Sequence, residues 1–278
     1  RKGKEEYVPL YEGKMVQAYD HRAASIVVNP ANLHRPAQPQ PASLKQHQDV
    51  NWLPEPQFWI DRQQIETPSS IQWTLAFKDV TAPTNMRTMI AMIVGMSGFG
   101  NTLPVLLPDG ANGEPVYRRF APLLLANLNS FVFDFIARQK VQGQHLNLYI
   151  VEQIPVISPH QFEATIGNQT IADFIREQVL RLTYTAVDLR PFAADMGYEG
   201  EPFVWDEDDR RHRLARLDAL FFHLYGLDRN DADYILAQFP IVREQDEKQF
   251  GRYLTRDLIL AYLNAVAAGD LETVVEVR

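Results

Sequence analysis

The sequence contains no cysteine, which excludes disulfide bonds and thiolate metal ligands and fits a reducing cytoplasm. It has no apolar run near the roughly 18 residues of a membrane-spanning helix. No apolar segment follows the basic residues at its start, as a signal peptide requires. It also begins without methionine. We therefore expect a cytoplasmic protein that is part of a longer chain and has no membrane partner.

Motifs of catalysis are absent as well. The sequence holds no phosphate-binding loop and no G-x-S-x-G nucleophile motif. Its seven histidines are scattered, without a pair at i,i+4, so no metal site is predicted. The cluster of Gly95, Gly98 and Gly100 departs from the dinucleotide-binding spacing and no helix is expected after it, which predicts a β-turn or bulge. The chain is thus expected to carry no catalytic, cofactor or metal site.

The acidic residues are concentrated in the second half of the chain. Residues 1–160 contain 14 Lys+Arg and 13 Asp+Glu, a balance of +1, whereas residues 161–278 contain 13 and 22, a balance of −9. The two balances sum to the net charge of −8. A near-neutral first half can still present a basic face to phosphates. The asymmetry also indicates a domain boundary near residue 160.

Hydrophobic periodicity predicts an α+β fold. The first half is predicted to contain strands at 71–78, 87–94, 103–107 and 146–151, extended segments within 7–28, a Pro-rich loop over 29–48 and one helix over 122–140. After Pro159 the pattern is helical throughout. We therefore expect a β-rich domain with flanking helices (1–160), followed by an acidic all-α domain (161–278).

Capping signals mark the helices of the second half. Thr170 and Asp173 resemble a capping box, Asp206 is placed to cap a helix over roughly 208–225, and Asp231 can begin a short helix. The last long helix is expected over 246–268, closed by Gly269.

Side chains that can read DNA gather in loops of the first half. Arg and Lys pair with guanine edges and phosphates, and Asn and Gln pair with adenine edges. Asn101 follows the glycine turn, and Arg138, Gln139 and Lys140 end the apolar helix. The same basic residues can instead satisfy the carbonyl groups at the helix end. Residue chemistry by itself therefore leaves both roles open.

Three stretches resemble large N6-adenine DNA methyltransferases, among them type IIG restriction-modification fusions and related phage-defence methylases. The first is residues 11–22 (Tyr-Glu-Gly-Lys-Met-Val-Gln-Ala-Tyr-Asp-His-Arg), the second runs from Phe77 to Ile90, and the third runs from Leu124 to Val156. In that family such stretches follow the catalytic domain and belong to the target-recognition domain. The matches together span about residues 10–160, and the remainder resembles the C-terminal extension of the same proteins.

The resemblance implies a role in DNA recognition. The chain would be the target-recognition module of an adenine-specific methyltransferase, with double-stranded DNA and an upstream methyltransferase domain as partners. The family's catalytic Asn/Asp-Pro-Pro-Tyr/Phe sequence and its glycine-containing S-adenosylmethionine motif do not occur here, and Asn29-Pro30 is followed by Ala and Asn. S-adenosylmethionine is therefore expected in the parent enzyme and not in this chain.

Eight residues are candidate DNA contacts, each with a structural alternative. The expected phosphate contacts are Lys14, Arg22 and Arg119, the expected base-edge contacts are Asn101, Arg138, Gln139 and Lys140, and Arg87 completes the set. Structurally, Arg22 can pair with Asp20, and Arg87 can bridge to a carboxylate such as Asp79. The rival function is a protein-interaction or scaffolding module, in which residues 161–278 dock on the methyltransferase domain or on a partner subunit.

Overall fold

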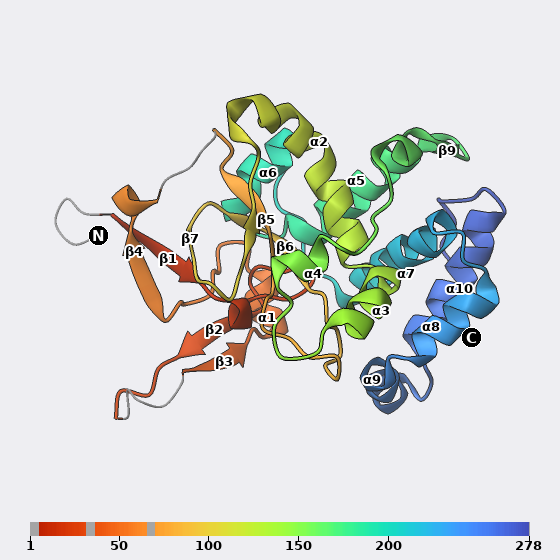
Figure 1. The fold of residues 1–278 in the computed structure, drawn as a ribbon, viewed down its shortest axis with the longest axis horizontal. Coiled ribbons are helices and arrows are strands. Elements are labelled where there is room, and N and C mark those ends of the chain that lie inside the picture. Colours follow the sequence, from red (N-terminus) through yellow and green to blue (C-terminus); the bar gives the residue numbers. More distant parts are fainter. Residues whose placement is uncertain (1–5, 32–36, 66–69, 278) are drawn as a thin grey trace. The chain divides into compact units, whose positions relative to one another are not determined.

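The computed structural model describes residues 6–31, 37–65 and 70–277 (Figure 1). The chain divides into two compact units. Unit 1 consists of residues 1–80, 90–121 and 180–205, and unit 2 consists of residues 81–89, 122–179 and 206–278. Each unit draws on three separate segments, so the division does not follow the single boundary expected at residue 160. The α+β class is confirmed, since small sheets occur together with a helical C-terminal region.

The central strand of unit 1 is β5 (Trp73–Phe77), which is buried along its whole length. It pairs antiparallel with β6 (Ala91–Gly95) on one side and with β8 (Val105–Leu106) on the other. Alternation with a period of two predicted β5, and a nearly continuous apolar run, typical of a strand covered on both faces, predicted β6. The core beneath them includes Met15, which is fully buried.

A second sheet of unit 1 has the order β4-β1-β7, built from β4 (Phe58–Asp61), β1 (Tyr7–Tyr11) and β7 (Gly98–Phe99). Strand β7 runs parallel to β1. A Cβ added at Gly98 would lie 2.6 Å from Cγ2 of Ile60, closer than side chains pack. The predicted β-turn or bulge is in the structure a short link, Met96–Ser97, between β6 and β7, and Gly98 stands where β7 approaches β4 closely.

The Pro-rich segment is more regular than predicted. Strand β2 (Ala24–Val27) pairs antiparallel with β3 (Gln38–Pro41), and the short helix α1 (Leu44–Gln48) follows. Ser43 begins α1 with a capping box, because its hydroxyl accepts the backbone N–H of Gln46 at 3.3 Å. The expectation of a loop over 29–48 is thus wrong for residues 38–48, and Pro36 lies outside the described residues.

The remaining elements are mostly helical. In unit 1 they are the 3-10 helices η1 (Gly13–Met15), η2 (Arg62–Gln64) and η4 (Val187–Leu189), and the helix α6 (Arg190–Asp195). Helices α2 (Gly110–Leu128) and α5 (Ile171–Thr183) contribute residues to both units. Unit 2 contains α3 (Phe131–Lys140), α4 (Leu148–Val151), η3 (Pro159–Glu163), β9 (Thr165–Ile166), β10 (Gln169–Thr170), α7 (Glu207–Leu224), α8 (Arg229–Ala237), α9 (Pro240–Phe250) and α10 (Leu254–Ala267).

Three further predicted elements differ from the structure. The single helix over 122–140 is wrong, because Ser130 begins a new helix there by accepting the N–H of Phe133 at 3.2 Å. The strand over 146–151 is the helical turn α4. The last helix is divided into α9 and α10, since Gly251 has the left-handed φ of 74° that ends a helix.

The predicted caps of the C-terminal helices are confirmed in two cases. Asp206 caps α7 by accepting the backbone N–H groups of Asp208 and Asp209, and the Thr170 hydroxyl accepts the N–H of Asp173 at 3.1 Å. The short helix α8 starts earlier than predicted, because Asp228 is its cap. Asp231, the third helical residue, completes a capping box by accepting the backbone N–H of Asp228 with its side chain.

The core of unit 2 is formed where α3, α7, α8 and α10 pack together, and α7, α8 and α10 lie side by side in Figure 1. Phe131 and Phe239 meet edge to face in this core, with ring centroids 4.6 Å apart. Among the described residues, no single helix has the length and apolar character of a membrane span; α2 and α3 meet that test only as a pair bent by 68°.

A buried carboxyl group in this core has a shifted pKa. Asp218 of α7 is 7% exposed, and its Oδ1 accepts the backbone N–H of Phe131 at 2.8 Å. Burial raises the pKa of Asp218 from 3.8 to about 7, an effect that nearby Arg87 opposes and Asp134 supports. Between these two pH values the folded chain binds a proton that the unfolded chain has released. We predict that the free energy of unfolding falls as pH rises through this window, by up to roughly 1.4 kcal/mol per pH unit.

Urea unfolding at a series of pH values, followed by far-UV circular dichroism, measures this slope. Asp218→Asn keeps an oxygen acceptor for the backbone N–H of Phe131 but removes the titrating proton. The free energy of unfolding should therefore fall less between pH 4 and 7 than in the wild type. Glu207→Gln changes an exposed carboxylate of the same helix and should retain the wild-type slope. An unchanged slope in Asp218→Asn would assign the pH dependence to other groups.

Candidate nucleic-acid interface

A polar hollow in unit 2 brings together exposed amide side chains that follow α3. It has a volume of about 620 Å³. Its lining consists of Gln139, Lys140, Gln142, Gly143, Gln144, His145, Asn147, Tyr149, Ile150 and Gln153. Two of the predicted base-edge residues, Gln139 and Lys140, thus lie at one site together with glutamines that the sequence places after the helix.

Buried apolar residues hold the loop of this site in place. Val141 and Leu146 are 3% and 0% exposed, whereas the four residues between them are all exposed. The backbone N–H of Thr81 donates to the carbonyl of Gln144 at 3.0 Å, which ties the centre of the loop to another segment of unit 2. The loop therefore presents its side chains to solvent from an anchored backbone.

The electrostatic character of the hollow is unusual for this acidic protein. No Asp or Glu occurs between Asp134 and Glu152, whereas Arg138, Lys140 and His145 do. Asp134 itself is fully buried. The described residues that line the hollow include no carboxylate, although the exposed Glu152 directly precedes the lining residue Gln153. Lys140 is the charged side chain of the lining that a phosphate backbone would meet.

Arg138 does not belong to this surface. Its Nη2 donates to the backbone carbonyls of Asn85 and Met86 at 2.6 and 2.7 Å, and its guanidinium stacks 4.0 Å above the Phe239 ring. Burial lowers the pKa of Arg138, although the Asp134 carboxylate counteracts this. The expected base-edge contact is thus corrected, because the side chain is only 9% exposed and its donors point inward.

Arg87 is likewise a structural residue. Its Nε donates to Oδ2 of Asp134 at 2.5 Å, its Nη2 donates to the carbonyl of Asn129, and its guanidinium lies 4.1 Å from the Phe131 ring centre. The alternative of a carboxylate bridge is therefore the one the structure shows, with Asp134 in place of the suggested Asp79.

Arg22 is completely buried in unit 1, so its expected phosphate contact is also corrected. Its two terminal nitrogens donate to the carbonyls of His47, Asp49, Trp52 and Thr185 at 2.8 to 3.0 Å. Its side chain has no solvent exposure through which it could reach a phosphate. Burial lowers the pKa of Arg22, and the carboxylates of Asp20 and Asp188 oppose that shift.

The other three candidates lie at the surface of unit 1. Asn101 is exposed in the turn after β7, and Arg119 is exposed on α2, with its guanidinium 5.1 Å from the Phe120 ring. Lys14 is 29% exposed and bonded to Glu12 and Gln57. None of these three residues lines the polar hollow of unit 2, which we call the glutamine hollow.

Three lining residues of the hollow escaped prediction. Gln153 joins the hollow from the end of α4, and Asn147 and Tyr149 were assigned to a strand that does not form. The excess of amides over acids across residues 139–153 was the one signal that pointed to them. Within the ranges that the structure describes, no group of three His, Asp or Glu side chains is placed to hold a metal ion.

Comparisons of this chain with protein-family models, with curated proteins and with solved structures find no match.

Proposed function

We propose that this chain is a cytoplasmic, sequence-reading DNA-binding module that serves an N6-adenine DNA methyltransferase. The observation that carries the proposal is the glutamine hollow, an anchored cluster of exposed amides with Lys140 and without carboxylates. The resemblance of residues 10–160 to target-recognition domains supports the same role. Methyl transfer, with S-adenosylmethionine as donor, would belong to an upstream domain, since this chain lacks the family's motifs for both.

The residues of the hollow have complementary tasks in this proposal. A glutamine amide offers a donor and an acceptor together, which matches N6 and N7 of adenine in the major groove. Lys140 supplies a positive charge for phosphate, which sets position rather than sequence. Gln142 and Gln144 are therefore proposed to discriminate bases, and Lys140 is proposed to hold the backbone.

Duplex binding is predicted to be salt-dependent and sensitive to two kinds of substitution. Lys140→Ala should weaken binding to all sequences alike. It should also reduce the salt slope, the slope of log binding constant against log salt concentration, by about one. The double change of Gln142 and Gln144 to Ala should leave that slope intact but relax the preferred sequence, by about 1–3 kcal/mol per lost base contact. Fluorescence anisotropy at several salt concentrations and selection from a random-sequence duplex pool measure the two effects.

Lys248→Ala is the matched control, because this exposed lysine lies on α9 of the same unit and outside the hollow. It should bind as the wild type does. Absence of binding at low ionic strength by the folded protein would refute the proposal, as would equal losses in Lys140→Ala and Lys248→Ala.

A further inference from the structure

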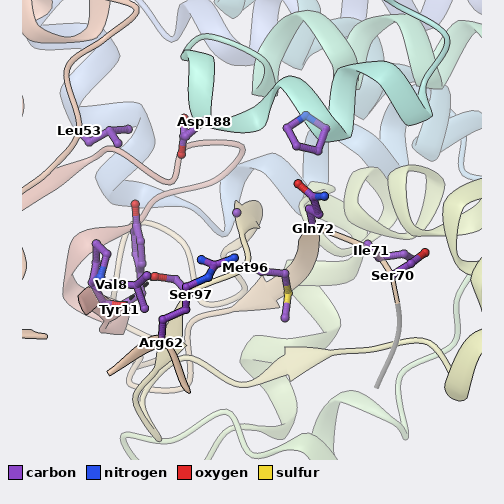
Figure 2. A pocket seen from close by; sticks show the side chains of 13 residues that line it. Val8, Tyr11, Leu53, Arg62, Ser70, Ile71, Gln72, Met96, Ser97 and Asp188 are labelled. Carbon is purple, nitrogen blue, oxygen red and sulfur yellow. Dashed lines mark hydrogen bonds between the residues drawn. The ribbon is translucent and has the colours of Figure 1, made fainter. Parts of the chain in front are cut away.

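Unit 1 contains a cavity of about 400 Å³ whose wall includes Arg62, Gln72 and Asp188 (Figure 2). The carboxylate of Asp188 is already engaged, because its Oδ2 lies 2.9 Å from Nε2 of His21 and its Oδ1 is shielded from solvent. This wall therefore offers little that distinguishes one class of ligand from another. A surface of more specific character lies elsewhere in unit 1, on the ribbon of strands β2 and β3 (Figure 1).

The ribbon has two unlike faces. Strands β2 and β3 pair antiparallel and form a sheet of two, without a third strand among the described residues. On one face Ala24 and Ile26 are buried, at 4% and 5% exposure. The other face, which we call the ribbon face, consists of the side chains that the register brings together there: Ser25, Val27, Gln38 and Gln40. Both glutamines of this face are exposed, and its valine is 51% exposed.

The segment that contains the ribbon is basic in an otherwise acidic chain. Residues 21–48 contain three Lys or Arg and no Asp or Glu, whereas the whole chain has 35 acidic residues and a net charge of −8. Of the three, Arg22 is buried, Lys45 is exposed on α1, and Arg35 lies outside the described residues. A polyanion such as DNA therefore meets less repulsion here than an acid-rich segment would exert.

The outer edges of the ribbon do not favour a partner's strand. On β2, the N–H of Ile26 points outward and donates to the carbonyl of Glu55 at 2.8 Å. Pro39 lies opposite Ile26, so the backbone nitrogen of Pro39 points outward as well, and Pro41 follows two residues later. Neither proline carries the N–H that a ladder needs. The exposed Glu55 borders the edge of β2 and is not part of the ribbon face, which is left as the contact surface.

The chemistry of the ribbon face matches base edges in a DNA groove. The major groove of B-DNA is wide enough to admit a two-stranded ribbon. The amide of Gln40 can pair with N6 and N7 of an adenine, and the methyl groups of Val27 can pack against the methyl group of a thymine. The side chains of the face are uncharged, so sequence would be read by hydrogen bonds and methyl contacts, while phosphate contacts such as one from Lys45 would set position.

We propose that the β2–β3 ribbon enters the major groove of duplex DNA, with Gln40 at an adenine edge and Val27 at a thymine methyl group. The inference rests on the proposed DNA-binding function and extends it, because the ribbon belongs to unit 1 and the glutamine hollow belongs to unit 2. The chain then reads DNA with two separate elements, so its preferred sequence has two parts that can be lost independently.

A negative charge placed on the ribbon face tests the contact. Gln40→Glu keeps the size of the side chain but repels phosphates and loses the adenine pairing, so duplex affinity should fall about tenfold or more at low salt. The melting temperature should stay unchanged, because Gln40 is exposed. Gln63→Glu changes an exposed glutamine of η2 in the same unit and should bind as the wild type does. Fluorescence anisotropy measures both affinities, and equal values for the two variants would overturn the proposal.

Selection from a random-sequence duplex pool separates this inference from the proposed function. Val27→Ser with Gln40→Ala should lose one part of the preferred sequence, and the double variant of the glutamine hollow should lose the other. Val204→Ser with Gln63→Ala changes two exposed side chains of unit 1 outside the ribbon and should keep both parts. If the ribbon variant selects the same sequence as the wild type, the inference fails and the proposed function stands. If the folded wild type binds no duplex, both fail.

Discussion

Replacing Arg22 by methionine is expected to destabilise unit 1 more than any other single change we describe, by at least about 3 kcal/mol. The guanidinium is fully buried and satisfies four backbone carbonyls, from His47 and Asp49 to Trp52 and Thr185. Methionine fills a similar volume but donates no hydrogen bond. The Asp49 carbonyl keeps the backbone N–H of Trp52 as a donor at 3.1 Å. Each of the other three carbonyls would be left without a donor, at a cost of roughly 1–3 kcal/mol, because it loses water in the folded state and gains nothing in return.

Tryptophan fluorescence during urea unfolding measures this loss. All four tryptophans, Trp52, Trp59, Trp73 and Trp205, belong to unit 1, so their emission follows that unit. Arg22→Lys should also be strongly destabilised, since one ammonium cannot reproduce the planar fork that bonds four carbonyls. Arg119→Met removes an exposed arginine and should shift the midpoint little. If Arg22→Met lowered the free energy of unfolding by less than about 1 kcal/mol, the buried guanidinium would contribute little to stability.

The second large effect is expected in unit 2, where Asp134→Asn should lower stability by about 3–5 kcal/mol. Asp134 is fully buried, and its oxygens accept from Arg87 Nε and from the backbone N–H groups of Thr88 and Met89 at 2.5 to 3.2 Å. Arg138 Nε lies 3.6 Å from the same carboxylate. Asparagine therefore leaves two enclosed guanidinium groups without their counter-charge.

Far-UV circular dichroism follows this change, because unit 2 contains most of the helices. Glu244→Gln, an exposed position of α9 in the same unit, should be neutral within about 0.5 kcal/mol. The double variant Arg87→Met with Asp134→Leu should recover part of the lost stability, since replacing both charges by apolar groups removes the unpaired one. No recovery in the double variant would indicate that the backbone N–H bonds of Thr88 and Met89 matter more than the ion pair.

The hydrogen-bond networks of Arg22 and Asp134 include residues from all three sequence stretches singled out above. The stretch of residues 11–22 ends in Asp20, His21 and Arg22, and all three are buried. The stretch from Phe77 to Ile90 contributes Arg87 and the carbonyls that Arg138 binds. Residues of this kind hold the fold together. The proposed base contacts lie instead in the loop after α3, which Thr81 holds through a backbone hydrogen bond to Gln144.

Local patterns in the sequence were sufficient to determine the α+β class, the apolar strands β5 and β6, and the caps at Asp206 and Thr170. These features depend on neighbours within a few residues, so a periodicity or a capping side chain marks them directly. The break at Ser130 and the turn at Gly251 are local too, but the apolar pattern on both sides continues through each of them.

Only the tertiary structure decided which charged residues are free to bind a ligand. Arg22, Arg87 and Arg138 read as exposed cations in the sequence, yet each is enclosed by carbonyls or a carboxylate from distant segments. Arg62, Gln72 and Asp188 follow no motif, and the fold brings them to one cavity across more than a hundred residues of chain. The physical reason is that burial and hydrogen-bond satisfaction depend on what packs nearby in space, and a residue's neighbours in sequence do not specify this.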